Sequence, residues 1–177
     1  PNTALSAAVA VMGPDRVKRS QAAMSALIDL FAKSGMSDPS DLSFDVSSIV
    51  DSAAADDAVV GALVSKKAGA RGKVMMAGVA ARAAQSVFIN FLGALAEKAD
   101  GKVNAQTLLG AICLHLAWKP LMRKRLSLIT VKALPWHFRI YSTLVGAAVN
   151  ADQQEEGSFA GVDDQEEHLA GLQSGLL

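Results

Sequence analysis

Residues 74–97, VMMAGVAARAAQSVFINFLGALAE, hold the longest regular apolar pattern in the chain. Steps of four and three alternate along them and place one stripe on a single helix face: Val74, Gly78, Ala81, Gln85, Phe88, Leu92 and Leu95. This spacing is typical of an amphipathic helix. Nowhere does the chain show the sustained alternation of a half-buried strand. We therefore expect an all-α fold whose longest helix spans residues 74–97.

Capping and turn residues divide the rest of the chain. Asp15 is expected to cap a helix that ends at Gly35, and residues 36–45 collect turn formers. Further helices are expected at 46–65, at 105–118 after the cap residue Asn104, from Pro120 and from Pro135. The predicted architecture is a compact bundle of about six helices. It comprises an apolar N-terminal arm (1–13), a helical core (14–150) and an acidic, flexible tail (151–177).

Composition restricts the class of protein. The chain has 177 residues, of which 51% are hydrophobic and one is cysteine. That length can bury a core without a disulfide, and a single cysteine is typical of a reducing compartment. No apolar run reaches the roughly 18 residues of a membrane-spanning helix, so we expect no membrane partner.

The formal charge of zero conceals a strong asymmetry. Residues 1–57 carry a net charge of −4, residues 58–150 carry +11, and residues 151–177 carry −7. A middle segment this basic attracts a polyanion even in a neutral molecule. The alternative is a solvated basic face that only keeps the protein soluble.

The sequence carries no strong signature of catalysis or of metal binding. His115, His137, His168 and Cys113 lack zinc-site spacing, and we expect Cys113 to be a buried thiol and His115 a hydrogen-bonded side chain. The segment 69–73 lacks the spacing and the hydroxyl of a phosphate loop. We therefore expect neither an enzyme nor a cofactor.

Basic residues interleaved with aromatic ones are the clearest functional signal. The basic residues form two groups, and five rings lie near them in the sequence. The first group is Lys66, Lys67, Arg71 and Lys73, the second is Arg123, Lys124 and Arg125, and the rings are those of Trp118, Trp136, His137, Phe138 and Tyr141. Cations bind phosphates and aromatic rings stack on unpaired bases, so the pattern favours single-stranded RNA bound without sequence preference. The alternative for the two tryptophans is a place in the core.

Several segments also resemble the nucleocapsid proteins of phleboviruses and tenuiviruses. They are LIDLFAKSGM (27–36), VVGALV (59–64) with the basic and methionine-containing stretch after it, LLGAI (108–112) leading to Trp118, and PWHFR (135–139). Coat proteins of flexible filamentous plant viruses are related to that family in fold.

The resemblance implies an all-helical core that holds genomic RNA in a basic cleft inside the virion or the host cytoplasm. It implies phosphate contacts for Lys66, Lys67, Arg71 and Lys73 and a cleft-lining apolar surface that includes Phe31 and Trp118. It also implies a homo-oligomer built by the N-terminal arm, whose apolar residues include Leu5, Val9, Val11 and Met12. The alternative is a helical adaptor or chaperone that binds proteins and no nucleic acid.

Overall fold

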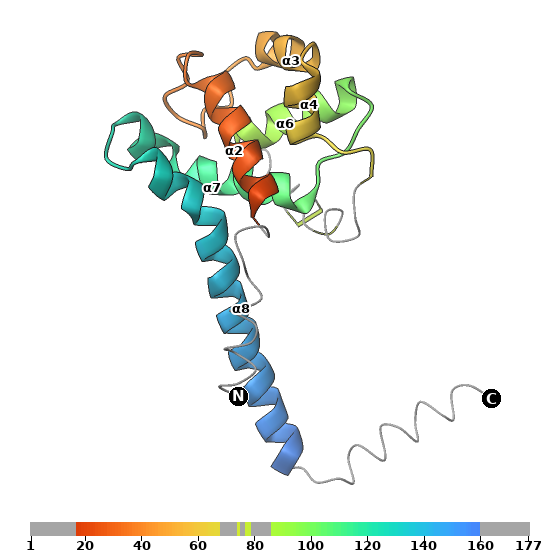
Figure 1. Ribbon diagram of the computed structural model, residues 1–177, viewed down its shortest axis with the longest axis vertical. Coiled ribbons are helices and arrows are strands. Elements are labelled where there is room, and N and C mark those ends of the chain that lie inside the picture. The colour runs from red at the N-terminus through yellow and green to blue at the C-terminus, as the bar shows by residue number, and fades with distance from the viewer. Residues whose placement is uncertain (1–16, 68–73, 75–76, 79–85, 160–177) are drawn as a thin grey trace, which may run out of the picture. The chain divides into compact units, whose positions relative to one another are not determined.

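The structure is a computed structural model that describes residues 17–67, 74, 77–78 and 86–159, with the backbone alone for 150–159. Six helices have defined bounds there: α2 (Lys18–Phe31), α3 (Ser47–Ala54), α4 (Asp57–Leu63), α6 (Val87–Lys98), α7 (Ala105–Met122) and α8 (Leu128–Phe159). The described part contains no strand beyond one isolated bridge, so the all-α prediction is confirmed (Figure 1). The predicted arm, residues 1–13, lies outside the described residues.

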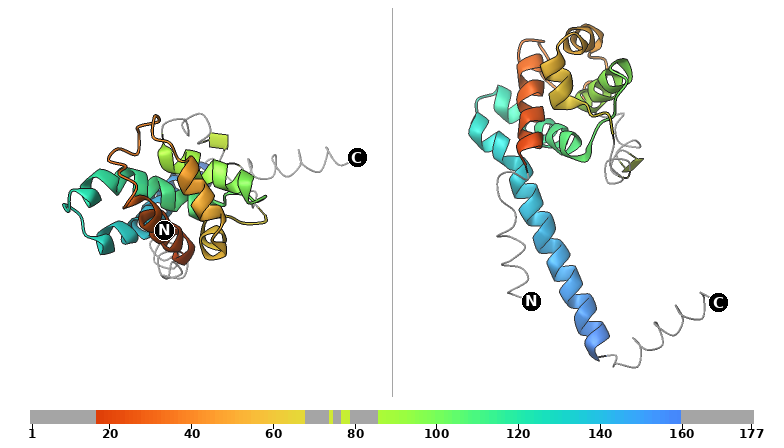
Figure 2. Two further views of the ribbon diagram at one scale, coloured as in Figure 1. Left: turned by 90° about the horizontal axis from the view of Figure 1, so that it is seen from above. Right: turned by 45° about the vertical axis from the view of Figure 1, so that its right-hand side comes forward.

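The chain divides into two compact units, residues 14–137 and a second unit that is described from Phe138 to Phe159. Helix α8 contributes its first residues to the larger unit and the rest to the second. Within the larger unit α2 packs along α7, and α3 packs beside α4 and α6 (Figure 2).

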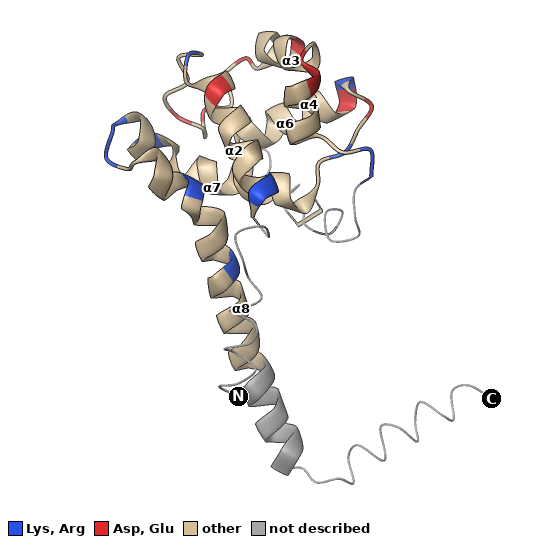
Figure 3. Ribbon diagram, in the orientation of Figure 1, with Lys and Arg blue, Asp and Glu red and all other residues tan. Residues whose placement is uncertain are grey.

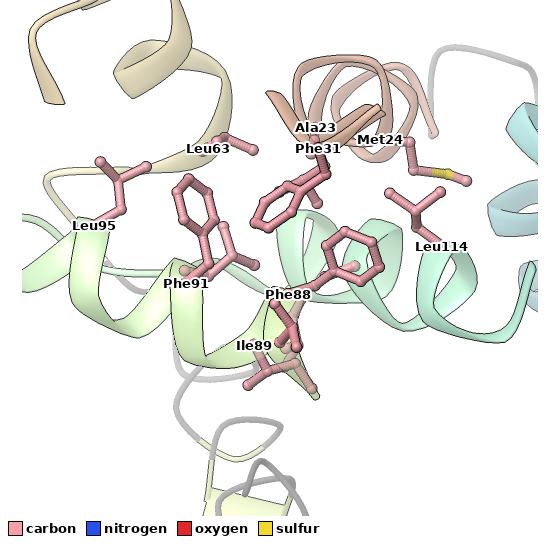
Figure 4. Close-up of a cluster of buried hydrophobic side chains, with 14 of the residues drawn as sticks. Ala23, Met24, Phe31, Leu63, Phe88, Ile89, Phe91, Leu95 and Leu114 are labelled. Atoms are coloured by element: carbon pink, nitrogen blue, oxygen red, sulfur yellow. The ribbon is translucent and has the colours of Figure 1, made fainter. Parts of the chain in front are cut away.

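Phe31 lies at the centre of the core of the larger unit. Its ring meets those of Phe88 and Phe91 edge to face, with centroids 5.1 and 5.2 Å apart (Figure 4). The centroid of the Phe88 ring in turn lies 5.3 Å from that of Trp118. Such edge-to-face pairs contribute about 0.5–1.5 kcal/mol each beyond the burial of their area. The cluster joins α2, α6 and α7 into one unit.

Gly110 allows α2 and α7 to approach closely. A Cβ atom at this position would lie 2.7 Å from the backbone oxygen of Ser20, closer than packed atoms come. The facing side of α2 buries residues at helical spacing: Ser20, Ala23, Met24, Leu27 and Phe31. The residue at 110 must therefore be glycine for these helices to pack at this separation.

The loops follow the turn chemistry of the sequence. Gly35 adopts φ +80° after α2, and the carboxylates of Asp38, Asp41 and Asp45 each accept a hydrogen bond from the backbone N–H two residues later. The predicted loop at 36–45 is confirmed, and a second turn lies after α6, where Asp100 adopts φ 47°.

Two predicted helices are wrong in extent. The expected helix 46–65 is divided because Asp56 adopts an extended conformation and caps α4, accepting hydrogen bonds from the N–H groups of Ala58 and Val59. The expected helix 74–97 does not run through Ser86, which is extended at φ −141° and ψ 118°. There the N–H of Val87 donates to the carbonyl of Pro39 at 2.8 Å instead of to a preceding helical turn.

The predicted roles of two prolines are also wrong. Pro120 lies within α7 and Pro135 within α8, so neither begins a helix. The break falls at Lys124, which adopts φ 57° between the two helices. The change of composition after Asn150 does not end α8 either, because the helix continues to Phe159, nine residues into the predicted tail.

Candidate nucleic-acid interface

Ser65 and Lys102 pair across two segments that are far apart in sequence. The N–H of Ser65 donates to the carbonyl of Lys102 at 2.9 Å, and the N–H of Lys102 donates back at 2.8 Å. The turn beside this bridge requires a glycine, because a Cβ on Gly101 would lie 2.1 Å from Cγ1 of the buried Val64. In such an antiparallel pair the two side chains lie on the same face, with Cβ atoms about 5 Å apart.

The hydroxyl of Ser65 connects this bridge to two helices. It accepts a hydrogen bond from the guanidinium of Arg19, on α2, and another from the side-chain amide of Asn104 at 3.1 Å. The oxygen of the same side-chain amide caps α7, since Asn104 Oδ1 accepts hydrogen bonds from the N–H groups of Gln106 and Thr107. The predicted cap is confirmed, and it also fixes where Arg19 and Lys102 lie.

Four exposed cations thus gather at one place, and we call them the basic edge: Arg19, Lys66, Lys67 and Lys102. Within the described part of the chain none of them forms an ion pair, whereas Lys98 pairs with Asp51 and Lys119 with Asp38. Figure 3 shows the cations at the start of α2 and on the loop after α4, and acidic residues on α3, at the start of α4 and at the end of α6. Like charges that lie close together without forming ion pairs produce a local positive potential.

The start of α2 carries two positive charges. Lys18 and Arg19 occupy its first turn, which holds no acidic residue. The positive end of a helix dipole repels cations, typically by about 0.3–1 kcal/mol each. The guanidinium of Arg19 is held at this position by its hydrogen bond to the Ser65 hydroxyl.

The second predicted basic group lies elsewhere in the larger unit. Arg123, Lys124 and Arg125 are exposed on the turn after α7, whereas Lys102 precedes α7. The 18 residues of α7 separate the two groups by about 27 Å at 1.5 Å per residue. The structure therefore does not bring them together at one phosphate. Arg71 and Lys73 lie outside the described residues.

Phe31 and Trp118 do not line an exposed cleft, contrary to the expectation from the resemblance. Both side chains are fully buried, and the indole N–H of Trp118 is already bound to the carbonyl of Met36. Aromatic pairing within the core satisfies both rings, so neither presents a face to a base. The core alternative is confirmed for Trp118. The exposed rings are instead those of Trp136, Phe138 and Tyr141 on α8.

Cys113 and His115 behave as the sequence predicts for structural residues. Burial raises the pKa of the Cys113 thiol to about 12, which keeps it protonated and unreactive. His115 Nδ1 lies 3.1 Å from Ser86 Oγ, and burial lowers the pKa of its imidazole. Within the described residues no three His, Cys, Asp or Glu side chains are grouped to hold a metal ion. The described helices include none that is long and apolar enough to cross a membrane.

An open depression of about 450 Å³ lies between α2 and α4. Asp29 and Asp56 contribute its charges. Two carboxylates repel an anionic ligand, so this depression does not extend the basic edge.

Sequence reasoning missed Arg19 and Lys102. Nothing local to either residue indicates its partner, because Lys102 is 37 residues from Ser65 and Arg19 is 46 residues from it. The only local signal is the turn at 100–102, which presents Lys102 directly after a glycine.

No family model, no curated protein and no solved structure matches this chain.

Proposed function

We propose that this chain is a nucleocapsid or coat protein that binds single-stranded RNA without sequence preference. The observation that carries the proposal is the basic edge, where Ser65 and its hydrogen bonds hold Arg19 beside Lys102 and next to the lysines at 66 and 67. In this proposal the protein packages RNA in the virion and in the host cytoplasm, and it has no catalytic role.

Phosphate contact is the mode of binding that this surface supports. Four exposed cations on different segments suit a flexible polyanion, and such contacts carry no sequence information. Phe31 and Trp118 are buried, so neither ring is available to stack on a base. Affinity therefore depends on charge and on salt more than on the identity of the bases.

The second part of the proposal is oligomerisation through the N-terminal arm, which includes Leu5, Val9, Val11 and Met12. The support is the uncharged, apolar sequence of residues 1–12, separated from α2 by Gly13 and Pro14. Deleting residues 1–12 is expected to reduce the assembly to smaller, folded species in light scattering. An unchanged assembly size would refute this part alone.

The first experiment is purification without nuclease, followed by the ratio of absorbance at 260 nm to that at 280 nm. Co-purifying RNA, released by ribonuclease and not by deoxyribonuclease, is the expected result. The stripped protein should then bind unrelated single-stranded RNAs with affinities within a few-fold of one another. Protein that purifies free of nucleic acid and binds no added RNA would refute the proposal and favour the adaptor or chaperone alternative.

A further inference from the structure

Helix α8 carries most of the large apolar side chains that the described chain exposes. In the second unit they form what we call the α8 stripe: Phe138, Tyr141, Leu144, Val145 and Val149. Tyr141 is the most exposed of them, at 68%. At 100° per residue these positions fall within an arc of about 140°. Ile140, Thr143 and Ala147, on the other side, are half-buried.

This stretch of α8 has the apolar composition of a helix that packs against another protein surface. From Ala133 to Val149 the only charged residue is Arg139. A helix so apolar is normally buried, and a contiguous exposed apolar patch marks an interaction surface. Phe138, Tyr141 and Val145 follow the three-then-four spacing of a helix that packs against another helix.

We propose that the α8 stripe binds the α8 stripe of a second copy of this chain, with the two helices antiparallel. The charge sequence of the helix supports this partner and this orientation. Lys132 and Arg139 lie toward the start of α8, whereas the sequence places acids at 152, 155 and 156 toward its end. In an antiparallel pair the basic part of each helix lies beside the acidic end of the other. In a parallel pair the two basic parts lie side by side, and so do the two acidic ends.

The two-fold symmetry of such a pair restricts the register. The same patch must face itself, so residues near the middle of the stripe meet their own copies. A centre at Val145 places 138 of one helix level with 152 of the other. The stripe is 12 residues long, or about 18 Å, from Phe138 to Val149. An interface of this length is at the small end of specific interfaces, which makes the dimer depend on protein concentration.

The register can be tested by disulfide cross-linking of the full-length, RNA-free protein with a mild thiol oxidant. Val145→Cys is expected to form a disulfide-linked dimer, because its two copies lie at the centre. Phe138→Cys is expected to cross-link at least tenfold less, because its copies lie about 21 Å apart along the axis and a disulfide needs Cα atoms within about 7 Å. The buried Cys113 gives no background in the unmodified chain.

Leu116→Cys is the matched control, since Leu116 is an apolar residue of α7 exposed to a similar degree, at 60%. Equal yields from Val145→Cys and Leu116→Cys would overturn the interface. Equal yields from Val145→Cys and Phe138→Cys would overturn the antiparallel register.

Sedimentation equilibrium over a range of protein concentrations tests the interface without a cross-link. Tyr141→Glu is expected to weaken the dimer at least tenfold, because it places an unpaired charge in an apolar contact. Leu116→Glu, with the same change of charge, is expected to leave the dimer unchanged. A chain that is monomeric at every concentration, or equal effects of the two variants, would refute the proposal. RNA is absent from both experiments, so their outcome is independent of whether the chain binds RNA.

Discussion

The indole N–H of Trp118 donates a hydrogen bond to the carbonyl of Met36 at 3.0 Å, joining α7 to the loop that follows α2. Both residues are buried, and the Trp118 ring also packs edge to face on Phe88. One side chain thus fixes the loop at 36–45 against the core. Its role is structural, which is why it is not available to a base.

Trp118→Phe is therefore expected to destabilise the chain. It removes the hydrogen bond, leaves the Met36 carbonyl unpaired and opens a cavity, at a total cost of about 1–3 kcal/mol. Urea unfolding followed by circular dichroism measures this loss. Trp136→Phe, on the partly exposed surface of α8, is expected to change stability much less. Equal effects of the two substitutions would contradict the core assignment of Trp118.

Two glycines give a pair of substitutions with opposite expected signs. Gly110→Ala is expected to destabilise by about 1–3 kcal/mol, because the new Cβ would lie 2.7 Å from the Ser20 carbonyl oxygen and would push α2 from α7. Gly93→Ala, on the exposed face of α6 with no atom within 4 Å, is expected to stabilise by about 0.5–1 kcal/mol. Thermal and urea unfolding measure both. A stabilising Gly110→Ala would show that the two helices are not packed as described.

His115 makes stability depend on pH near neutrality. Burial holds the pKa of its imidazole below the ordinary 6.5, and the positive charge of Lys119 lowers it further, while Asp38 partly opposes the shift. Below pH 6.5 the unfolded chain takes up a proton that the folded chain resists. Folding stability is therefore present above that pH and is lost as the pH falls through 6.5 toward the folded value.

Urea midpoints at pH 7.5 and 5.5 measure this effect. The unmodified chain is expected to have the lower midpoint at pH 5.5, and His115→Gln is expected to reduce the difference. His137→Gln, on the exposed surface of α8, serves as the control and is expected to retain it. A His115→Gln variant with an unchanged difference would assign the pH dependence to other groups.

Local chemistry predicts the ends of several elements in this chain. Asn104, Gly35 and the aspartates of 36–45 act through hydrogen bonds or backbone angles within a few residues, and the sequence contains all of that information. Asp56 carries the same kind of signal, an N-cap followed by an acidic first turn, and the apolar pattern around it obscures this signal.

The remaining features depend on contacts between distant residues. Ser86 is extended because the N–H of the next residue finds the carbonyl of Pro39, and Arg19 reaches the basic edge because Ser65 accepts its hydrogen bond. Lys124 ends α7 at a positive φ without a glycine to indicate it. The cleft role that the resemblance implied for Phe31 and Trp118 is wrong because both side chains are fully buried, and local sequence similarity does not distinguish a core ring from an exposed one.

The salt dependence of RNA binding tests the central claim most directly. The experiment compares two triple variants of equal charge: Lys66, Lys67 and Lys102 changed to Gln on the basic edge, and Lys33, Lys98 and Lys119 changed to Gln elsewhere. The measured quantity is the slope of the logarithm of the binding constant for single-stranded RNA against the logarithm of the salt concentration. For the first variant this slope is expected to become shallower by about 2, because each phosphate neutralised by a cation contributes roughly 0.7 to it. The second variant should keep the slope of the unmodified chain. Equal slopes for the two variants would contradict the assignment of the basic edge as the RNA-binding surface.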